Sequence, residues 1–261
     1  MVKPARLNQI NVRQHDNESP TFKLLPDAWV IKVGGQSIID RGSKAVMPLV
    51  AEIKRNLDRG KKLIIGTGAG TRARHAYSLA VELGLPTGVL SALGAGVATQ
   101  NARILGWLLA DRGIPVLSPG ELSSKLPFDL AERGAVVFPG MPPYTFWERF
   151  PDIGLIPPHR TDTGCFLVAE TFGVAGMIYV KDEDGLYSDN PKIKPKAQFI
   201  KRINVNELKK MNLPDLVIEP PVVEFLGRAK NIRRVQVING LHEGELSAAL
   251  NGDSVGSIIE A

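Results

Sequence analysis

Short apolar runs alternate along the chain with longer segments in which apolar residues recur every three or four positions. The short runs are AWVIKV, KLIIG, IPVL, AVVFPG, MIYV and VQVIN. Apolar residues at helical spacing after the first run and before IPVL each predict a helix with one buried face. The two sets are Val46, Leu49, Val50, Ile53 and Leu57, then Val97, Ile104, Leu105 and Leu108 with Asn101 as a polar interruption. Pro48 fits the first helix only if it lies in the first turn.

Glycine marks the ends of the predicted helices. Four stretches reach a glycine and then an apolar segment: LDRGKKLII, VELGLPTGVL, ADRGIPVL and ETFGVAGMIYV. Glycine just past a helix ends it, because glycine adopts the left-handed conformation without a Cβ penalty. Apolar strands that alternate with such helices predict a mainly parallel sheet covered on both faces, an α/β fold with three αβα layers.

The carboxyl ends of the predicted strands are the expected binding edge, because α/β proteins bind ligands there. The segments at this edge are Gly34, Gly35, Gly66 to Gly70, Gly140 and Asp182 to Tyr187. We expect a single domain over residues 23–261. Residues 1–22 have no periodic apolar pattern, which predicts a flexible or partner-contacting N-terminal arm.

Composition argues against several classes of function. The net charge of +5 comes from 32 basic and 27 acidic residues whose signs are interspersed, so we expect no nucleic-acid partner. No apolar run approaches the ~18 residues that span a bilayer, and we expect no membrane association. Cys165 is the only cysteine, which excludes an intramolecular disulfide and indicates a reducing, cytoplasmic location.

Two glycine turns offer donors to an anion. VIKVGGQS places Lys32 near the end of a strand, with Gly34 and Gly35 directly after it. Amides at these glycines suit phosphate oxygens, although a tight turn beside an incidental lysine explains the motif equally well. In GTGAGTRARH, small residues precede Arg72 and Arg74 at the start of a predicted helix. This density of donors favours an anion site over arginines that merely face solvent.

Two later motifs place acidic residues at the same edge. In RTDTGCFL, Asp162 stands where a helix begins, and its carboxylate either caps that helix or orients lysines around a phosphoryl group. Its position alone does not separate the two roles. In VKDEDGLYSDNP, Lys181, three acids and Tyr187 follow a strand, which suits a nucleotide loop with Mg²⁺ or a simple polar turn.

Taken in order, KVGG, GTGAG, TDTG and DGLYSDNP resemble the motifs of the amino-acid kinase superfamily, with bacterial uridylate kinase as the nearest enzyme. The resemblance implies an amino-acid-kinase-like fold, with an acceptor or oxoanion lobe over about residues 23–160 and a nucleotide lobe over about 161–261. It implies that ATP and Mg²⁺ bind and that Lys32, Asp162 and Lys181 are catalytic. The implied nucleotide-binding residues are Gly34, Gly35, Gly68, Gly70, Arg72, Asp184, Gly185, Leu186, Tyr187, Asn190 and Pro191.

Longer segments resemble a narrower family, the molybdenum storage proteins, and especially their β-type subunits. These segments are GQSIIDRG, GTGAGTRARH, FPGMPPY, IPPHRTDTGCFL, VKDEDGLY and VQVINGL. The resemblance implies ATP-dependent storage of molybdate or tungstate as polyoxometalate clusters inside a cage. The implied cage is an α3β3 hetero-hexamer with an α-type subunit, or a homo-hexamer. We take His75, Glu132 and His159 as candidate oxometalate contacts.

Three functions therefore stay open. The first is molybdenum or tungsten storage with ATP hydrolysis linked to oxoanion uptake, and the second is a uridylate kinase. The third is a regulatory subunit that binds ATP without turnover. Molybdate is a tetrahedral dianion like phosphate, so an anion site built from amides and arginines suits either acceptor.

Overall fold

The computed structural model describes residues 21–213 and 216–261, and its centre is a sheet of seven strands. The strands of this sheet are β1 (Ala28–Val33), β2 (Lys62–Thr67), β3 (Ala135–Pro139), β4 (Gly176–Lys181), β7 (Arg202–Asn204), β8 (Arg234–Asn239) and β9 (Ser257–Glu260). A separate hairpin pairs β5 (Leu186–Tyr187) with β6 (Phe199–Ile200). The predicted arm over residues 1–22 lies outside the described residues except for its last two positions.

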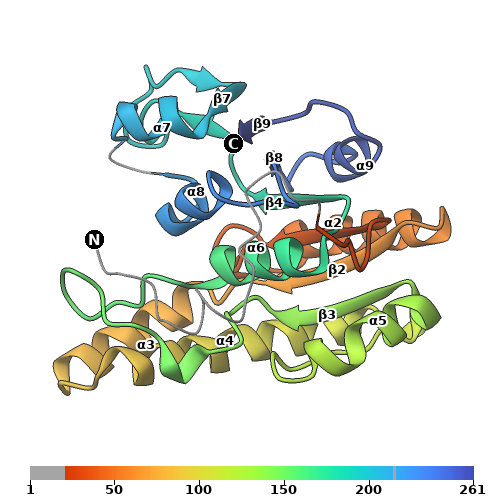
Figure 1. The fold of residues 1–261 in the computed structure, drawn as a ribbon, viewed down its shortest axis with the longest axis horizontal. Helices are drawn as coiled ribbons and strands as arrows, with labels where there is room; N and C mark the ends of the chain where they lie inside the picture. Colours follow the sequence, from red (N-terminus) through yellow and green to blue (C-terminus); the bar gives the residue numbers. More distant parts are fainter. Residues whose placement is uncertain (1–20, 214–215) are drawn as a thin grey trace, which may run out of the picture.

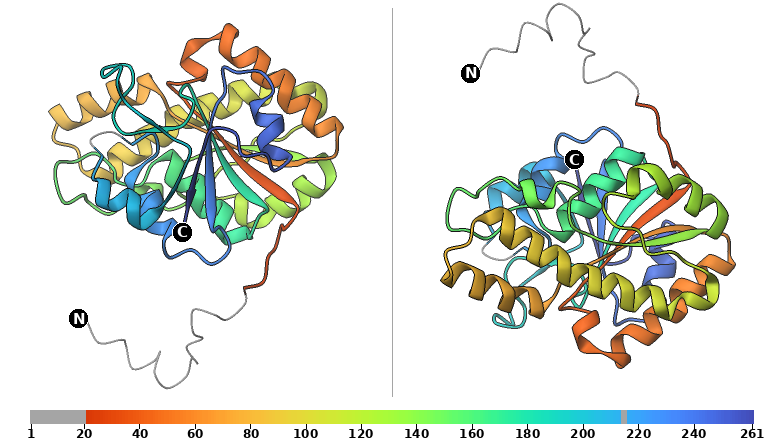
Figure 2. Two further views of the ribbon diagram at one scale, coloured as in Figure 1. Left: turned by 90° about the horizontal axis from the view of Figure 1, so that it is seen from above. Right: turned by 90° about the horizontal axis from the view of Figure 1, so that it is seen from below.

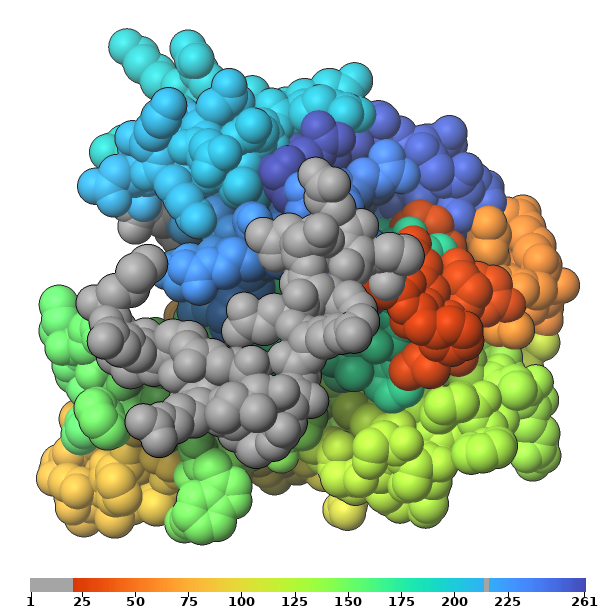
Figure 3. Space-filling view, in the orientation of Figure 1, coloured from red at the N-terminus to blue at the C-terminus, as the bar shows by residue number. Residues whose placement is uncertain are grey.

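The sheet has the order β3-β2-β1-β4-β8-β9-β7 (Figure 1). β9 runs antiparallel to β8, and the other neighbouring strands run parallel. The chain therefore builds the sheet outward from β1 in both directions. In Figure 3, the yellow and light-green segments that shortly precede β3 occupy the lower part of the molecule, and the cyan and blue segments after β4 occupy the upper part. The assignment of separate roles to two lobes stays a prediction.

Helices cover both faces of the sheet. They are α2 (Ser43–Asp58), α3 (Thr71–Glu82), α4 (Thr87–Leu108), α5 (Leu122–Arg133), α6 (Thr161–Phe172), α7 (Val205–Met211), α8 (Pro220–Leu226) and α9 (Glu245–Leu250). Single 3₁₀ turns lie at Ile39–Arg41, Ala110–Arg112 and Thr145–Trp147. Among the described residues, no helix has the length and apolar character needed to cross a membrane.

Each face of the sheet has its own apolar core, because successive strand residues point to opposite faces. On one face, Val30 and Tyr179 pack with residues of α5, α6, α7 and α8. On the other face, Ile31 and Ile65 pack with residues of α2, α4 and α9. Figure 2 shows the twisted sheet between these two layers. The predicted fold class, a three-layer αβα arrangement around a mainly parallel sheet, is confirmed.

The predicted helix ends are confirmed as well. The four glycines have positive φ angles, which are 78° at Gly60, 69° at Gly84, 64° at Gly113 and 59° at Gly173. Pro48 lies in the second turn of α2 and not in the first. The helix continues through it, with the loss of one backbone hydrogen bond on a face where the proline is exposed.

The prediction of a strand at IPVL is wrong. This segment forms only an isolated bridge, Val116 to Val137, next to β3. Pro115 removes one amide donor from so short a run, which limits the ladder that it can form. The sequence analysis also missed β7 and β9, which are only three and four residues long and whose pairing depends on partners distant in the chain.

The loops that follow β1 and β2 touch each other through their backbones. A Cβ added to Gly35 would lie 2.3 Å from the amide nitrogen of Gly70, and one on Gly68 would lie 2.4 Å from that of Gly35. Asn101, fully buried on α4, donates to the carbonyl oxygen of Gly68 at 2.7 Å. Asn101, the one polar residue in the apolar pattern of α4, therefore holds the loop after β2 in place.

We expect Gly35→Ala to lower the free energy of unfolding by roughly 1–3 kcal/mol, because the new methyl group forces backbone atoms of the two loops apart. Gly96→Ala is the matched control, since Gly96 is helical and a Cβ there meets nothing within 4 Å. The control should raise the stability by up to about 1 kcal/mol. Urea denaturation measures both changes. Equal stability of Gly35→Ala and the wild type would contradict the close contact.

Candidate functional site

A cavity of about 1310 Å³ opens at the carboxyl edge of the sheet. Its walls come from the turns after β1 and β2, from α3, from the start of α6, and from two loops later in the chain. The sequence-predicted residues that line it are Lys32, Gly34, Gly35, Gly68, Gly70, Asp162, Lys181, Gly185, Leu186, Tyr187, Asn190 and Pro191. The tertiary structure thus brings residues from four separate motifs into one space, as the binding-edge rule for parallel sheets predicts.

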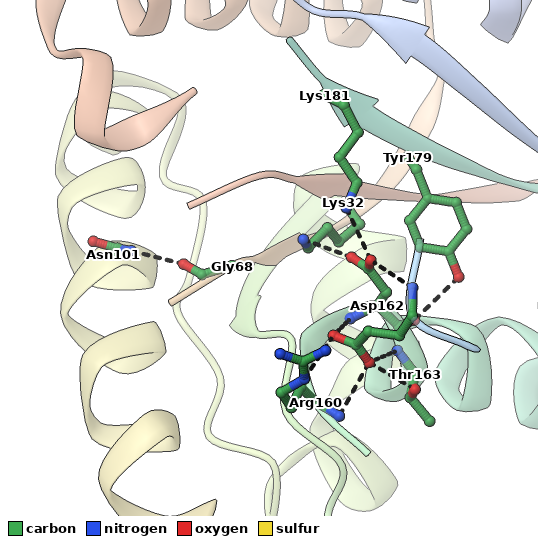
Figure 4. Close-up of polar contacts among 9 residues, drawn as sticks. Lys32, Gly68, Asn101, Arg160, Asp162, Thr163, Tyr179 and Lys181 are labelled. Atoms are coloured by element: carbon green, nitrogen blue, oxygen red, sulfur yellow. Dashed lines mark hydrogen bonds and ion pairs between the residues drawn. The ribbon is translucent and has the colours of Figure 1, made fainter. Parts of the chain in front are cut away.

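Two lysines and one aspartate form the charged centre of the cavity (Figure 4). Asp162 Oδ1 lies 2.6 Å from Nζ of Lys32, and its Oδ2 accepts a hydrogen bond of 2.8 Å from Nζ of Lys181. The lysines come from the neighbouring strands β1 and β4, and the aspartate from the first turn of α6. All three residues have buried or nearly buried side chains. This centre has two cations for one anion, so an anionic ligand would balance its charge.

The pKa values follow from that arrangement. Burial by itself would raise the pKa of Asp162, but Lys181 and Lys32 outweigh it and hold the pKa below its ordinary value. Burial opposes the charge on Lys32, yet the adjacent carboxylate of Asp162 prevails and raises its pKa. For Lys181, burial together with repulsion from Lys32 prevails over Asp162, so its pKa is lowered.

Glu219 is a functional candidate that the sequence analysis missed. Its carboxylate accepts hydrogen bonds from the backbone amides of Arg160 (3.0 Å), Asp162 (3.1 Å) and Thr163 (3.0 Å), and from the Thr163 hydroxyl (2.7 Å). Glu219 therefore caps α6 across 56 to 59 positions of sequence. Asp162 is thereby released from the capping role, and the structure favours its alternative role as the partner of the two lysines.

Some amides of the glycine turns are already used inside the protein. The amides of Gly34 and Gly68 donate to carbonyl oxygens at the ends of β4 and β1, at 3.0 and 2.8 Å. At the start of α3, the amide of Thr71 donates to Asp40 at 2.6 Å. The amide of Gly34 thus already has an acceptor within the protein, although Gly34 lines the cavity. Its assignment to the nucleotide stays a prediction.

The predicted nucleotide loop forms one end of the cavity. Gly185 to Tyr187, Asn190 and Pro191 line it, and Tyr187 lies edge-on to Phe199 with ring centroids 5.4 Å apart. Asp184 is not part of the lining, and its carboxylate accepts a hydrogen bond of 2.8 Å from the side chain of Asn239.

Helical periodicity decides which residues of GTGAGTRARH reach the cavity. Arg74, Tyr77 and Ser78 lie on one face of α3 and line the cavity. Arg72 is on a different face and donates to side chains of α4, including Gln100 Oε1 at 2.8 Å. Arg72 does not line the cavity, because residues two apart on a helix do not share a face, and its assignment to the nucleotide stays an untested prediction.

None of the three candidate oxometalate contacts is among the residues that line the cavity, and each belongs to a different segment of the chain. His75 is exposed on α3, and Glu132 is exposed near the end of α5, where it pairs with Arg133 at 2.8 Å. His159 is buried, with Nδ1 2.8 Å from Glu148 Oε1, and its ring stacks on Phe225. Within residues 21–213 and 216–261, no group of three His, Cys, Asp or Glu side chains is placed to hold a metal ion. The geometry thus gives these three residues no common site.

We expect Asp162→Asn to lower the free energy of unfolding at pH 7 by roughly 3–5 kcal/mol, because two buried ammonium groups lose their counter-charge. The lowered pKa of Asp162 means that its ionised form stabilises the fold fully above an unfolded pKa of about 3.9. That stabilisation is lost as the pH falls further. The gap between wild type and variant in urea denaturation should therefore narrow below pH ~4. A gap that does not change with pH would contradict the ion-pair assignment.

Comparison with known proteins gives a consistent result. The amino acid kinase family matches residues 27–239. The chain is 58% identical over 240 residues to molybdenum storage protein subunit beta of Azotobacter vinelandii, which covers 92% of this chain and 88% of that protein. It is 26% identical over 245 residues to uridylate kinase of Metallosphaera sedula, which covers 88% of this chain and 98% of that protein.

A solved structure with the same fold is uridylate kinase from Archaeoglobus fulgidus, with a TM-score of 0.68 at 22% sequence identity. That match covers 89% of this chain and 99% of the other. The sequence matches and the fold match thus indicate the same family as the motifs around the cavity. The chain belongs to the amino acid kinase family, as a homologue of molybdenum storage protein subunit beta and a distant relative of the uridylate kinases.

Proposed function

We propose that this chain is an ATP-binding subunit of an oligomeric cage that stores molybdenum, or tungsten, as polyoxometalate clusters. The observation that carries the proposal is 58% identity over 92% of the chain with a molybdenum storage subunit, against 26% with a uridylate kinase. The β designation of that relative supports an α-type partner, and we infer an α3β3 hetero-hexamer, with a homo-hexamer as the other arrangement. A cytoplasmic location remains our expectation.

The residues of the cavity suit the triphosphate of ATP. Lys32 and Lys181 would contact phosphate oxygens with their surplus positive charge, and Asp162 would hold both ammonium groups in place. The turn at Gly35 would supply a backbone amide, since the space beside it excludes a side chain. Tyr187, which is half-buried, would lie against the base. ATP supplies a phosphoryl group whose transfer or hydrolysis would be linked to oxoanion uptake.

Mg²⁺ would be held mainly by the phosphates. The acidic residues of the nucleotide loop already have protein partners: Asp182 pairs with Arg41 and Lys192, and Asp184 with Asn239. The loop therefore offers the cation few uncommitted carboxylates. We infer that Mg²⁺ enters with the nucleotide and that protein ligands add little to its binding.

The experiment that tests the function is purification of the protein from molybdate-fed cells. Metal per chain is measured first, and ATP consumption is then measured with molybdate, tungstate or UMP as the second substrate. We expect retained molybdenum and ATP consumption that depends on molybdate. Stoichiometric UDP formation without retained metal would establish the uridylate kinase alternative, and ATP binding without any turnover would favour the regulatory subunit.

We expect Lys32→Ala to reduce ATP turnover by roughly 100-fold while the protein stays folded at the assay temperature, because a buried charge at the phosphates is lost. Lys44→Ala is the matched control, because it removes the same charge from an exposed position on α2. Initial rates and thermal unfolding are measured for both. Parallel losses of activity and stability in Lys32→Ala would make this lysine structural.

A further inference from the structure

Arg160 lies at the opposite end of the charged centre from the nucleotide loop. It precedes α6 and lines the cavity, and in Figure 4 Lys181 lies above Asp162 and Arg160 below it. Its side chain is 42% exposed, and the exposed part faces the cavity that the residue lines. No motif of the sequence analysis assigned it a role. Besides Lys32 and Lys181, the cavity thus has a further cation at Arg160, which lies across the Asp162 carboxylate from Lys181.

The guanidinium of Arg160 has unused hydrogen-bonding capacity. Its Nε is buried and has no hydrogen-bond partner in the part of the chain that the structure describes. The nearby Glu219 Oε1 is 3.9 Å away, which is beyond hydrogen-bond length. Both oxygens of Glu219 already accept hydrogen bonds at the start of α6. A buried N–H without an acceptor is unfavourable, so no hydrogen bond at Nε holds the guanidinium in place, and its exposed part can turn toward a bound anion.

The cavity wall near Arg160 also suits an anion. Arg160 lines the same cavity as Arg74, Tyr77 and Ser78, which share one face of α3. This face therefore presents a second guanidinium and a hydroxyl group to the same space. Guanidinium groups form paired hydrogen bonds with tetrahedral oxoanions, which a single ammonium does not.

We propose that Arg160 binds a tetrahedral oxodianion on the acceptor side of the cavity, opposite the nucleotide loop. The inference rests on the proposed function for the identity of that dianion as molybdate or tungstate. The phosphate group of UMP is a tetrahedral oxodianion as well, and the test distinguishes it from molybdate and tungstate. Arg160 donates from the exposed end of its guanidinium to two oxygens of the anion, while Lys32 and Lys181 bind the nucleotide.

The competing explanation is that Arg160 serves only as a counter-charge for Glu219. A lysine at position 160 would keep that charge but lose the planar fork of donors. The variants are therefore Arg160→Gln and Arg160→Lys, with Arg59→Gln as a matched control on an exposed residue beyond α2. Thermal unfolding confirms that each variant is folded, and Arg160→Lys keeps the test available if Arg160→Gln is unstable.

The measurements use the full-length protein in the assembly in which it purifies. Equilibrium dialysis with metal analysis gives the affinity for molybdate, and calorimetry gives the affinities for ATP and for UMP. We expect Arg160→Gln to weaken molybdate binding by roughly 10-fold or more and to leave ATP binding within about twofold. Arg160→Lys should recover little of the loss, and Arg59→Gln should match the wild type.

Three results would overturn the inference. They are unchanged molybdate binding in Arg160→Gln, an equal loss of ATP affinity, and full recovery in Arg160→Lys. If the wild type binds UMP but not molybdate, the proposed storage function is wrong, and the affinity of the same variants for UMP then tests the role of Arg160. If Arg160→Gln also leaves UMP binding unchanged, the proposed function and the proposed role of Arg160 are both wrong.

Discussion

The buried contact between Asp162 and the two lysines is the interaction on which the site depends. Because β1 and β4 are parallel neighbours, their carboxyl ends bring Lys32 and Lys181 to the same edge, and α6 begins close enough to place Asp162 between them. A buried ion cluster of this kind is weak evidence for stability, since removing charges from water offsets much of their attraction. The surplus positive charge of the cluster is better understood as preparation for an anionic ligand.

Two carboxylates from other parts of the chain shape how that ligand is bound. Glu219 caps α6 and Asp40 caps α3, so the helix termini nearest the cavity already have negative partners. Binding of anions then falls mainly to side-chain cations and to a few turn amides. In Figure 4, Lys181 lies on one side of Asp162 and Arg160 on the other, and all three residues line the cavity.

Local patterns predicted much of the fold and of the nucleotide end of the site. Five of the six apolar runs are strands, and the four glycines end helical segments, because both signals depend on neighbouring residues. The failures have two causes. IPVL contains a proline that limits its pairing, and the lengths and pairing of β7 and β9 depend on strands far away in the chain. Arg72 and Arg74 look equivalent in sequence. In the structure, Arg72 faces α4 and Arg74 lines the cavity, because the packing of α3 determines which of its faces meets α4.

The sequence by itself determined the fold class, the binding edge and the family, because periodicity, turn glycines and contiguous motifs are local properties of the chain. Tertiary structure decided the partners of each charge. Asp162 and Glu219 are both acids at the start of a helix, α6 and α8 respectively. Nothing in their local sequence reveals that Asp162 contacts the two lysines while Glu219 caps α6. Tertiary structure also decides that Nε of Arg160 has no hydrogen-bond partner among the described residues, since its neighbours come from segments that are distant in the sequence.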